Sequence, residues 1–233
     1  MTLHNNSKYA SLLRETFVVG SIAQPESLQG LNRHTVEKLA DMVELRLDAY
    51  PSLRPEAVPE WGLPLLITAR CPAEGGRNGL DAGHRSALLR SFLPKAAAVD
   101  VEIQSLQEMR KICGEIKASR ALLVLSFHDF KVTPVLEELQ TLLARAVEAG
   151  ADVVKFATTL QGPRDVATLS QLLALSPRPP LSIMGMGPLG KASRMLFAQM
   201  GPVFNYGYLD VATVPGQWSA GRMKELQAEL SSP

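Results

Sequence analysis

Short apolar runs recur at fairly even intervals along the chain and predict eight β-strands. Most are continuous apolar stretches rather than strict alternations of apolar and polar residues, which is typical of strands covered on both faces. The predicted strands span residues 17–23, 41–48, 64–70, 98–103, 122–129, 152–158, 180–186 and 203–209.

Amphipathic segments lie between most of these runs and predict helices. After the second strand, in the sequence YPSLRPEAVPEWG (50–62), a helix is missing or very short. The predicted helices span residues 31–42, 85–94, 105–116, 134–150, 165–175, 193–200 and 219–230.

Eight strands that alternate with helices over 233 residues predict an α/β protein with the (β/α)8 TIM barrel fold. An open, doubly wound sheet is the alternative. No linker rich in proline, glycine or serine divides the chain, so we expect one domain over residues 1–233, with residues 1–16 as an N-terminal extension.

The composition of the chain argues against several classes of protein, among them nucleic-acid-binding, membrane-spanning and disulfide-rich proteins. The net charge is +1 and no tract is rich in lysine or arginine, which argues against nucleic acid as a partner. No apolar run reaches the length of a membrane span, and residues 1–17 lack the apolar core of a signal peptide. We therefore expect a cytoplasmic protein with no membrane partner. Two cysteines are too few for a disulfide scaffold or a cysteine zinc site.

A barrel places its active site at the carboxyl ends of the strands and in the loops that follow. Polar residues gather at those positions. They are Glu44, Arg46, Asp48, Arg70, Glu74, Asp100, Glu102, Ser126, His128, Asp129, Lys155, Arg194, Thr213 and Gln217.

Several of these candidates also have a purely structural interpretation. Arg46 is as readily a structural ion-pair partner of Glu44 or Asp48. An isolated histidine such as His128 is more often a hydrogen-bonded core residue. Cys71 follows Arg70, whose charge can lower the pKa of the thiol, but no second feature marks it as a nucleophile. The turn GMGPLGKASR (185–194) is either a tight turn or a weak phosphate-binding signal.

Lys155 is the hardest of these residues to explain structurally, because it interrupts the apolar strand DVVKFAT. Burying a lysine is costly unless it is paired or neutral. Apolar surroundings and nearby positive charge favour the neutral amine, which attacks carbonyl groups and forms an imine. An ion pair with Asp100 or Glu102 is the alternative. His128 ends the preceding strand at a similar height, and an amine beside an acid/base group predicts Schiff-base chemistry.

Seven motifs in order then make the chain resemble the type I 3-dehydroquinate dehydratases of the shikimate pathway. The resemblance runs from about residue 17 to residue 224. Its motifs are ELRLD (44–48), TARCPAEGG (68–76), DVEI (100–103), SFHDF (126–130), VVKFA (153–157), GPLGKASR (187–194) and PGQ (215–217).

The resemblance implies a lyase of aromatic amino acid biosynthesis that dehydrates 3-dehydroquinate through a lysine Schiff base, with no metal or cofactor, and it suggests a homodimer. It makes Lys155 the imine lysine, His128 the general acid/base, Glu74 its orienting partner and Arg194 the partner of the substrate carboxylate. The other implied substrate contacts are Ser21, Glu44, Arg46, Arg70, Met184, Met186, Tyr206, Thr213 and Gln217.

The chain departs from the family pattern at a few positions. Phe127 stands where a more polar residue is usual, Tyr206 replaces a common phenylalanine, and Thr213 and Val214 replace serine and alanine. Thr213 keeps a hydroxyl group, whereas Val214 adds bulk to a loop expected to close over the substrate. Two other functions stay open: a class I aldolase that cleaves a sugar phosphate, and an inactive barrel that binds a small acid.

Overall fold

The computed structural model describes residues 16–24, 26–175 and 178–231, and within them the chain forms eight β-strands. All eight predicted strands are confirmed, with ends that differ by at most a few residues. The predicted N-terminal extension lies almost wholly outside the described residues. The strands are β1 (Phe17–Ile22), β2 (Met42–Arg46), β3 (Leu65–Thr68), β4 (Ala98–Glu102), β5 (Leu122–Asp129), β6 (Val153–Thr159), β7 (Leu181–Met186) and β8 (Phe204–Tyr208).

The strands form one parallel sheet in the order β7-β6-β5-β4-β3-β2-β1-β8. The two edge strands meet, because the amide of Val203 donates to the carbonyl of Leu181 (2.9 Å) and the Ser182 hydroxyl donates to the carbonyl of Phe204 (2.5 Å). The sheet is therefore a nearly closed barrel. The predicted (β/α)8 barrel is confirmed, and the open doubly wound sheet is wrong.

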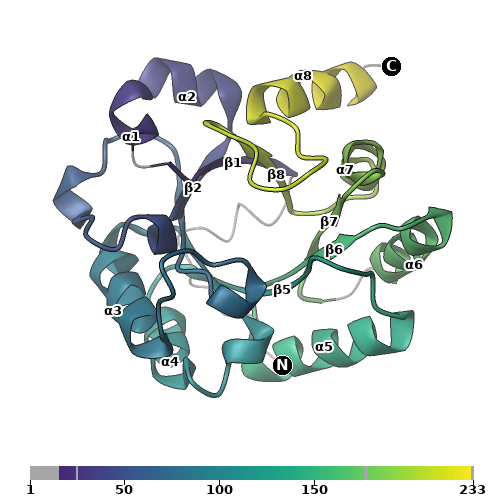
Figure 1. Cartoon of the computed structure of the whole chain (residues 1–233), viewed down its shortest axis with the longest axis horizontal. Helices are drawn as coiled ribbons and strands as arrows, with labels where there is room; N and C mark the ends of the chain where they lie inside the picture. The colour runs from purple at the N-terminus through teal and green to yellow at the C-terminus, as the bar shows by residue number, and fades with distance from the viewer. Residues whose placement is uncertain (1–15, 25, 176–177, 232–233) are drawn as a thin grey trace.

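Helices surround this barrel on the outside (Figure 1). The seven predicted helices are confirmed, and the short α1 was not predicted. Between β2 and β3, the described residues form only two short 3-10 turns, Leu47–Ala49 and Pro55–Ala57, as the sequence suggested. The helices are α1 (Ser27–Gly30), α2 (Arg33–Leu39), α3 (Ala82–Phe92), α4 (Arg110–Ala118), α5 (Leu136–Ala149), α6 (Pro163–Ala174), α7 (Gly190–Ala198) and α8 (Ala220–Ser231).

Successive residues of each strand face opposite sides of the barrel wall. On β6, Val154 and Phe156 pack in the layer between strands and helices, whereas Val153 and Ala157 pack inside the barrel. Lys155 lies between the latter two and therefore points inward.

Phe127 of β5 points outward from the barrel wall, toward the helices. Its ring packs edge-on against Phe156, with centroids 6.4 Å apart, in the layer under the helices. The departure from the family pattern at this position therefore lies outside the barrel interior.

Among the described helices, none is long and apolar enough to span a lipid bilayer.

Candidate active site

A pocket opens at the carboxyl ends of the strands, and every residue to which the resemblance gave a role lines it. Five other polar candidates from the strand ends do not line the pocket: Asp48, Asp100, Glu102, Ser126 and Asp129. Its volume of about 190 Å³ suits a single small molecule. The predicted lining residues are Ser21, Glu44, Arg46, Arg70, Glu74, His128, Lys155, Met184, Met186, Arg194, Tyr206, Thr213 and Gln217.

Sequence reasoning missed four lining residues: Gly75, Arg77, Phe130 and Ala157. Gly75, Phe130 and Ala157 lie within the motifs quoted above, and Arg77 directly follows one of them. Counting every residue of these motifs, and the next residue in the loop, as a candidate would have found all four. Val214, noted as a bulky residue of the last loop, lines the pocket as well.

The amine of Lys155 lies deep in this pocket, and its side chain is 5% exposed. Nζ donates to Oδ2 of Asp100 at 3.0 Å and lies 3.9 Å from Oε1 of Glu44. On another side, Nζ lies 3.9 Å from the centroid of the Tyr206 ring. The ion pair with Asp100, left open by the sequence, is thus present, and it holds the amine at one position in the pocket.

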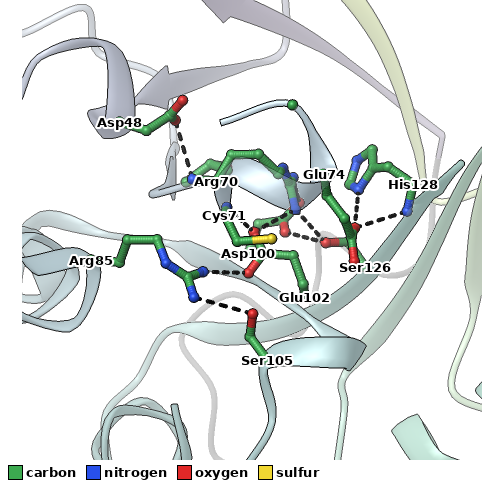
Figure 2. A network of polar contacts seen from close by, with 12 residues as sticks. Asp48, Arg70, Cys71, Glu74, Arg85, Asp100, Glu102, Ser105, Ser126 and His128 are labelled. Carbon is green, nitrogen blue, oxygen red and sulfur yellow. Dashed lines mark hydrogen bonds and ion pairs between the residues drawn. The ribbon is translucent and has the colours of Figure 1, made fainter. Parts of the chain in front are cut away.

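A buried ion network continues from Asp100 (Figure 2). The guanidinium of Arg70 donates to Oδ2 of Asp100 and to Oε1 of Glu102, both at 3.0 Å, and to the Ser126 hydroxyl at 2.7 Å. Burial alone would raise the pKa of Asp100, but the charges of Arg70 and Lys155 hold it well below its ordinary value. Asp100 is therefore a carboxylate at neutral pH.

His128 and Glu74 form a pair at the pocket wall (Figure 2). One oxygen of Glu74, Oε2, accepts from both the backbone amide and Nδ1 of His128, each at 2.9 Å. Burial and the nearby charges of Arg70 and Lys155 lower the pKa of His128 well below its ordinary value. The imidazole is therefore neutral, and a proton on Nδ1 leaves Nε2 free to accept one.

Burial also raises the pKa of Glu74 to about 7, although Arg70 opposes this shift. Its second oxygen, Oε1, is buried without a hydrogen-bond partner in the described structure. Glu74 is therefore poised between its charged and neutral forms near neutral pH.

Other acidic groups hold the rim and floor of the pocket. Glu44 accepts from the hydroxyls of Ser21 and Thr68. Arg46 makes two hydrogen bonds to the carboxylate of Asp48, at 2.9 and 2.8 Å. The structural ion pair proposed for Arg46 from the sequence is thus confirmed, with Asp48 as the partner.

Arg194 is a buried cation that has no acidic partner among the described residues. Its side chain comes from the first turns of α7, and NH1 donates to the carbonyl of Tyr206 at 2.6 Å. Nε has no partner, and within the described part of the chain no carboxylate lies within ion-pairing distance. Burial lowers its pKa to about 10. A guanidinium in such a position is suited to bind an anionic group of a ligand.

The loop after β8 closes one side of the pocket. Oε1 of Gln217 accepts from the amide of Thr213 (2.9 Å) and from its hydroxyl (3.2 Å). Gly216, at φ 79°, packs its backbone against Gly187 of the loop after β7, and the amide of Gly187 donates to the carbonyl of Pro215. The two loops therefore support each other beside the pocket.

Cys71 is a buried residue whose thiol is not activated, in agreement with the lack of any second feature that would mark it as a nucleophile. Burial, with the charge of Glu102, raises the pKa of the Cys71 thiol, although Arg70 is its neighbour in the sequence. Across the described residues, no group of three or more histidine, cysteine, aspartate or glutamate side chains is arranged to hold a metal ion. His34 and His84 are exposed, as expected, whereas His4 lies outside the described residues.

Comparison with known proteins identifies the family. Residues 22–231 match the family model of type I 3-dehydroquinase. The 3-dehydroquinate dehydratases of Methanosarcina barkeri and Methanocella arvoryzae are each 32% identical to this chain, over 92% and 80% of it and over 95% and 85% of their own lengths. The crystal structure of the 3-dehydroquinate dehydratase from Aquifex aeolicus has a TM-score of 0.79 at 27% identity and covers 92% of this chain and 98% of its own. The chain therefore belongs to the type I 3-dehydroquinase family of enzymes.

Proposed function

We propose that this enzyme dehydrates 3-dehydroquinate to 3-dehydroshikimate through an imine on Lys155, with His128 as the general acid and base. One observation carries the proposal: the Lys155 amine and the His128 imidazole line one pocket together with Arg194, a buried arginine with no acidic partner in the part of the chain that the structure describes. The pocket thus offers a nucleophile, a proton carrier and a binding site for a carboxylate.

The first step would be attack of the neutral Lys155 amine on the C3 ketone of the substrate. Water leaves, and a protonated imine remains. Asp100 at 3.0 Å holds the nitrogen in place and stabilises the positive charge of the iminium. The Tyr206 ring at 3.9 Å contacts the same nitrogen through its π face.

The second step would be elimination. The iminium withdraws electrons and acidifies the adjacent C2 hydrogen, which the neutral His128 removes to give an enamine. Glu74 stabilises the imidazolium that results, because its carboxylate accepts from Nδ1. His128 then gives the proton to the departing C1 hydroxyl group, and water leaves. Hydrolysis of the conjugated imine releases the product and restores Lys155.

Substrate recognition follows from the remaining charges. Arg194 would pair with the carboxylate of the substrate, and Thr213 and Gln217 would cover it from the last loop. Ser21, Glu44 and Arg46 face the ring hydroxyls in this arrangement, while Met184, Met186 and Tyr206 supply the apolar side. Arg70 donates to three buried protein groups, so we assign it to the floor of the site as well as to substrate binding.

The two alternative functions lose support. Membership of the 3-dehydroquinase family favours dehydration over cleavage of a carbon–carbon bond in a sugar phosphate. The presence of Lys155, His128 and Glu74 in one pocket argues against an inactive binding barrel. A homodimer and a cytoplasmic location stay predictions.

Replacement of the lysine tests the mechanism. Lys155→Met keeps the length of the side chain but removes the nucleophile, so turnover of 3-dehydroquinate, followed by the ultraviolet absorbance of the conjugated product, should fall to background. Lys191→Met is the matched control, because Lys191 contacts the ring of Trp218 rather than the pocket. Turnover by Lys155→Met at a rate close to that of the control would refute the imine mechanism.

A further inference from the structure

Helix α3 carries a buried arginine that the proposed reaction does not use. Arg85 is 2% exposed, although a helix on the outside of a barrel usually presents arginine to water. Its NH1 donates to Oε2 of Glu102 at 2.7 Å and its NH2 to the Ser105 hydroxyl at 3.2 Å. An exposed carboxylate, Glu108, lies 4.0 Å from NH2. Burying this charge is costly, so its partner in the barrel wall needs an explanation.

That partner, Glu102, ends β4 and is shared between two arginines (Figure 2). Oε2 accepts from Arg85, whereas Oε1 accepts from Arg70 at 3.0 Å and from the amide of Cys71 at 2.9 Å. Glu102 thus connects a helix outside the strands to the arginine at the floor of the pocket.

The connection reaches the reactive amine in two more contacts. The second nitrogen of Arg70 donates to Oδ2 of Asp100, and the same oxygen accepts from Nζ of Lys155, both at 3.0 Å. Charges alternate along this chain of contacts from Arg85 to Lys155. Arg70 donates to both Asp100 and Glu102, so its positive charge is shared between the two carboxylates. The less of that charge Asp100 receives, the more strongly Asp100 stabilises a positive charge on the Lys155 amine.

We propose that Arg85 is a positioning residue for the reaction: by neutralising Glu102, it leaves Arg70 free to neutralise Asp100 and so favours the uncharged, nucleophilic form of Lys155. This inference rests on the proposed function, because it needs Lys155 to be the nucleophile. Without Arg85, Glu102 draws Arg70 toward itself, and Asp100 then holds Lys155 more firmly as a cation.

The sign of the effect follows from the charges. Removing the positive charge of Arg85 stabilises a positive charge on Lys155, so imine formation needs a higher pH. Removing the negative charge of Glu102 does the reverse. Neither variant substitutes any of the other charged or titratable groups that line the pocket or pair with the amine, and they are Glu44, Arg46, Arg70, Glu74, Arg77, Asp100, His128, Arg194 and Tyr206.

The test measures imine formation against pH. Each variant is mixed with 3-dehydroquinate and borohydride, and the reduced adduct is quantified by intact mass. The pH of half-maximal trapping should rise by about one unit in Arg85→Gln and fall by a similar amount in Glu102→Gln. Arg85→Lys, which keeps the charge, should return the midpoint toward that of the wild type, and the double variant Arg85→Gln/Glu102→Gln should lie between the single variants.

Arg90→Gln is the matched control, because Arg90 lies on the same helix and pairs with Glu115 at the surface, at 2.7 Å. Its midpoint should equal that of the wild type. A folded Arg85→Gln with an unshifted midpoint would overturn the inference, and if this variant does not fold, an unshifted Glu102→Gln overturns it instead. Failure of the wild-type protein to give any adduct would refute the proposed function, whatever the variants do.

Discussion

At the scale of single residues, the pocket contains polar groups that the described structure leaves without partners. Oε1 of Glu74, Nε of Arg194 and the hydroxyl of Tyr206 are all buried and make no hydrogen bond. Each such group costs about 1–3 kcal/mol of stability relative to a satisfied one. A substrate that carries a carboxylate and hydroxyl groups would satisfy them, so the lost stability is regained in binding.

Glu74 gives a prediction about pH. The pKa of this carboxyl is raised to about 7, chiefly by burial, and the ionised form is the one that accepts a hydrogen bond from Nδ1 and stabilises a positive charge on His128. We therefore expect kcat/KM to fall as the pH drops below about 7. Glu74→Gln should lose this acid limb together with roughly 100-fold or more of the activity. The pH profiles of the two proteins provide the measurement.

The same substitution should increase stability at high pH. Because its pKa is raised, folded Glu74 holds a proton that the unfolded chain releases above pH 4.5, and its contribution to stability is lost as the pH rises to about 7. Urea unfolding above pH 7 should therefore show Glu74→Gln to be at least as stable as the wild type.

For the kinetic prediction, an acid limb of kcat/KM that is unchanged in Glu74→Gln would assign that limb to another group.

At the scale of elements, strand periodicity explains why much of the site could be predicted. Ser126 and His128 share one face of β5, as Val153, Lys155 and Ala157 share one face of β6. The inward direction of these side chains follows from their spacing of two residues. Arg85 could not be found in this way, because its contact with Glu102 joins a helix to a strand and leaves no mark in the local pattern.

The support of one loop by another gives a prediction about Gly216. A Cβ atom there would lie 2.5 Å from the carbonyl oxygen of Gly187, and the φ of 79° disfavours any side chain. Gly216→Ala should therefore push the loop after β8 away from the loop after β7 and raise the KM by about tenfold, equivalent to ~1.4 kcal/mol.

Gly201→Ala is the control for backbone strain. Gly201 has a φ of 85° and open space around its Cβ position, so alanine there should cost stability without raising the KM. Steady-state kinetics and thermal unfolding of both variants separate the two effects. Equal KM values in Gly216→Ala and the wild type would show that the contact between the loops does not shape the site.

At the scale of the whole molecule, the sequence indicates eight strands but not how the barrel closes. Alternation of strands and helices predicts a parallel sheet, whereas closure depends on the last strand meeting the first and on the edges joining. Here β8 pairs with β1, and the contact between β7 and β8 depends on a few hydrogen bonds. The short α1 was missed because a single turn of helix has too few residues to show a period.

Closure gives a prediction about stability. The buried hydroxyl of Ser182 donates to the carbonyl of Phe204 across the β7–β8 edge, and Ser182→Ala leaves that carbonyl without this donor. We expect a loss of about 1–3 kcal/mol in the free energy of unfolding. The kcat should change little, because Ser182 lies outside the set of pocket-lining residues. Urea titration and turnover provide the measurement, and a midpoint equal to that of the wild type would contradict the role of this edge.

The most direct test of the proposed mechanism is the site of covalent attachment. The wild-type protein is mixed with 3-dehydroquinate, reduced with borohydride and mapped by peptide mass spectrometry. The mechanism predicts one adduct of substrate or product mass, on Lys155, that is absent from Lys155→Met. Full dehydratase turnover with no adduct, or an adduct on another lysine, would contradict it.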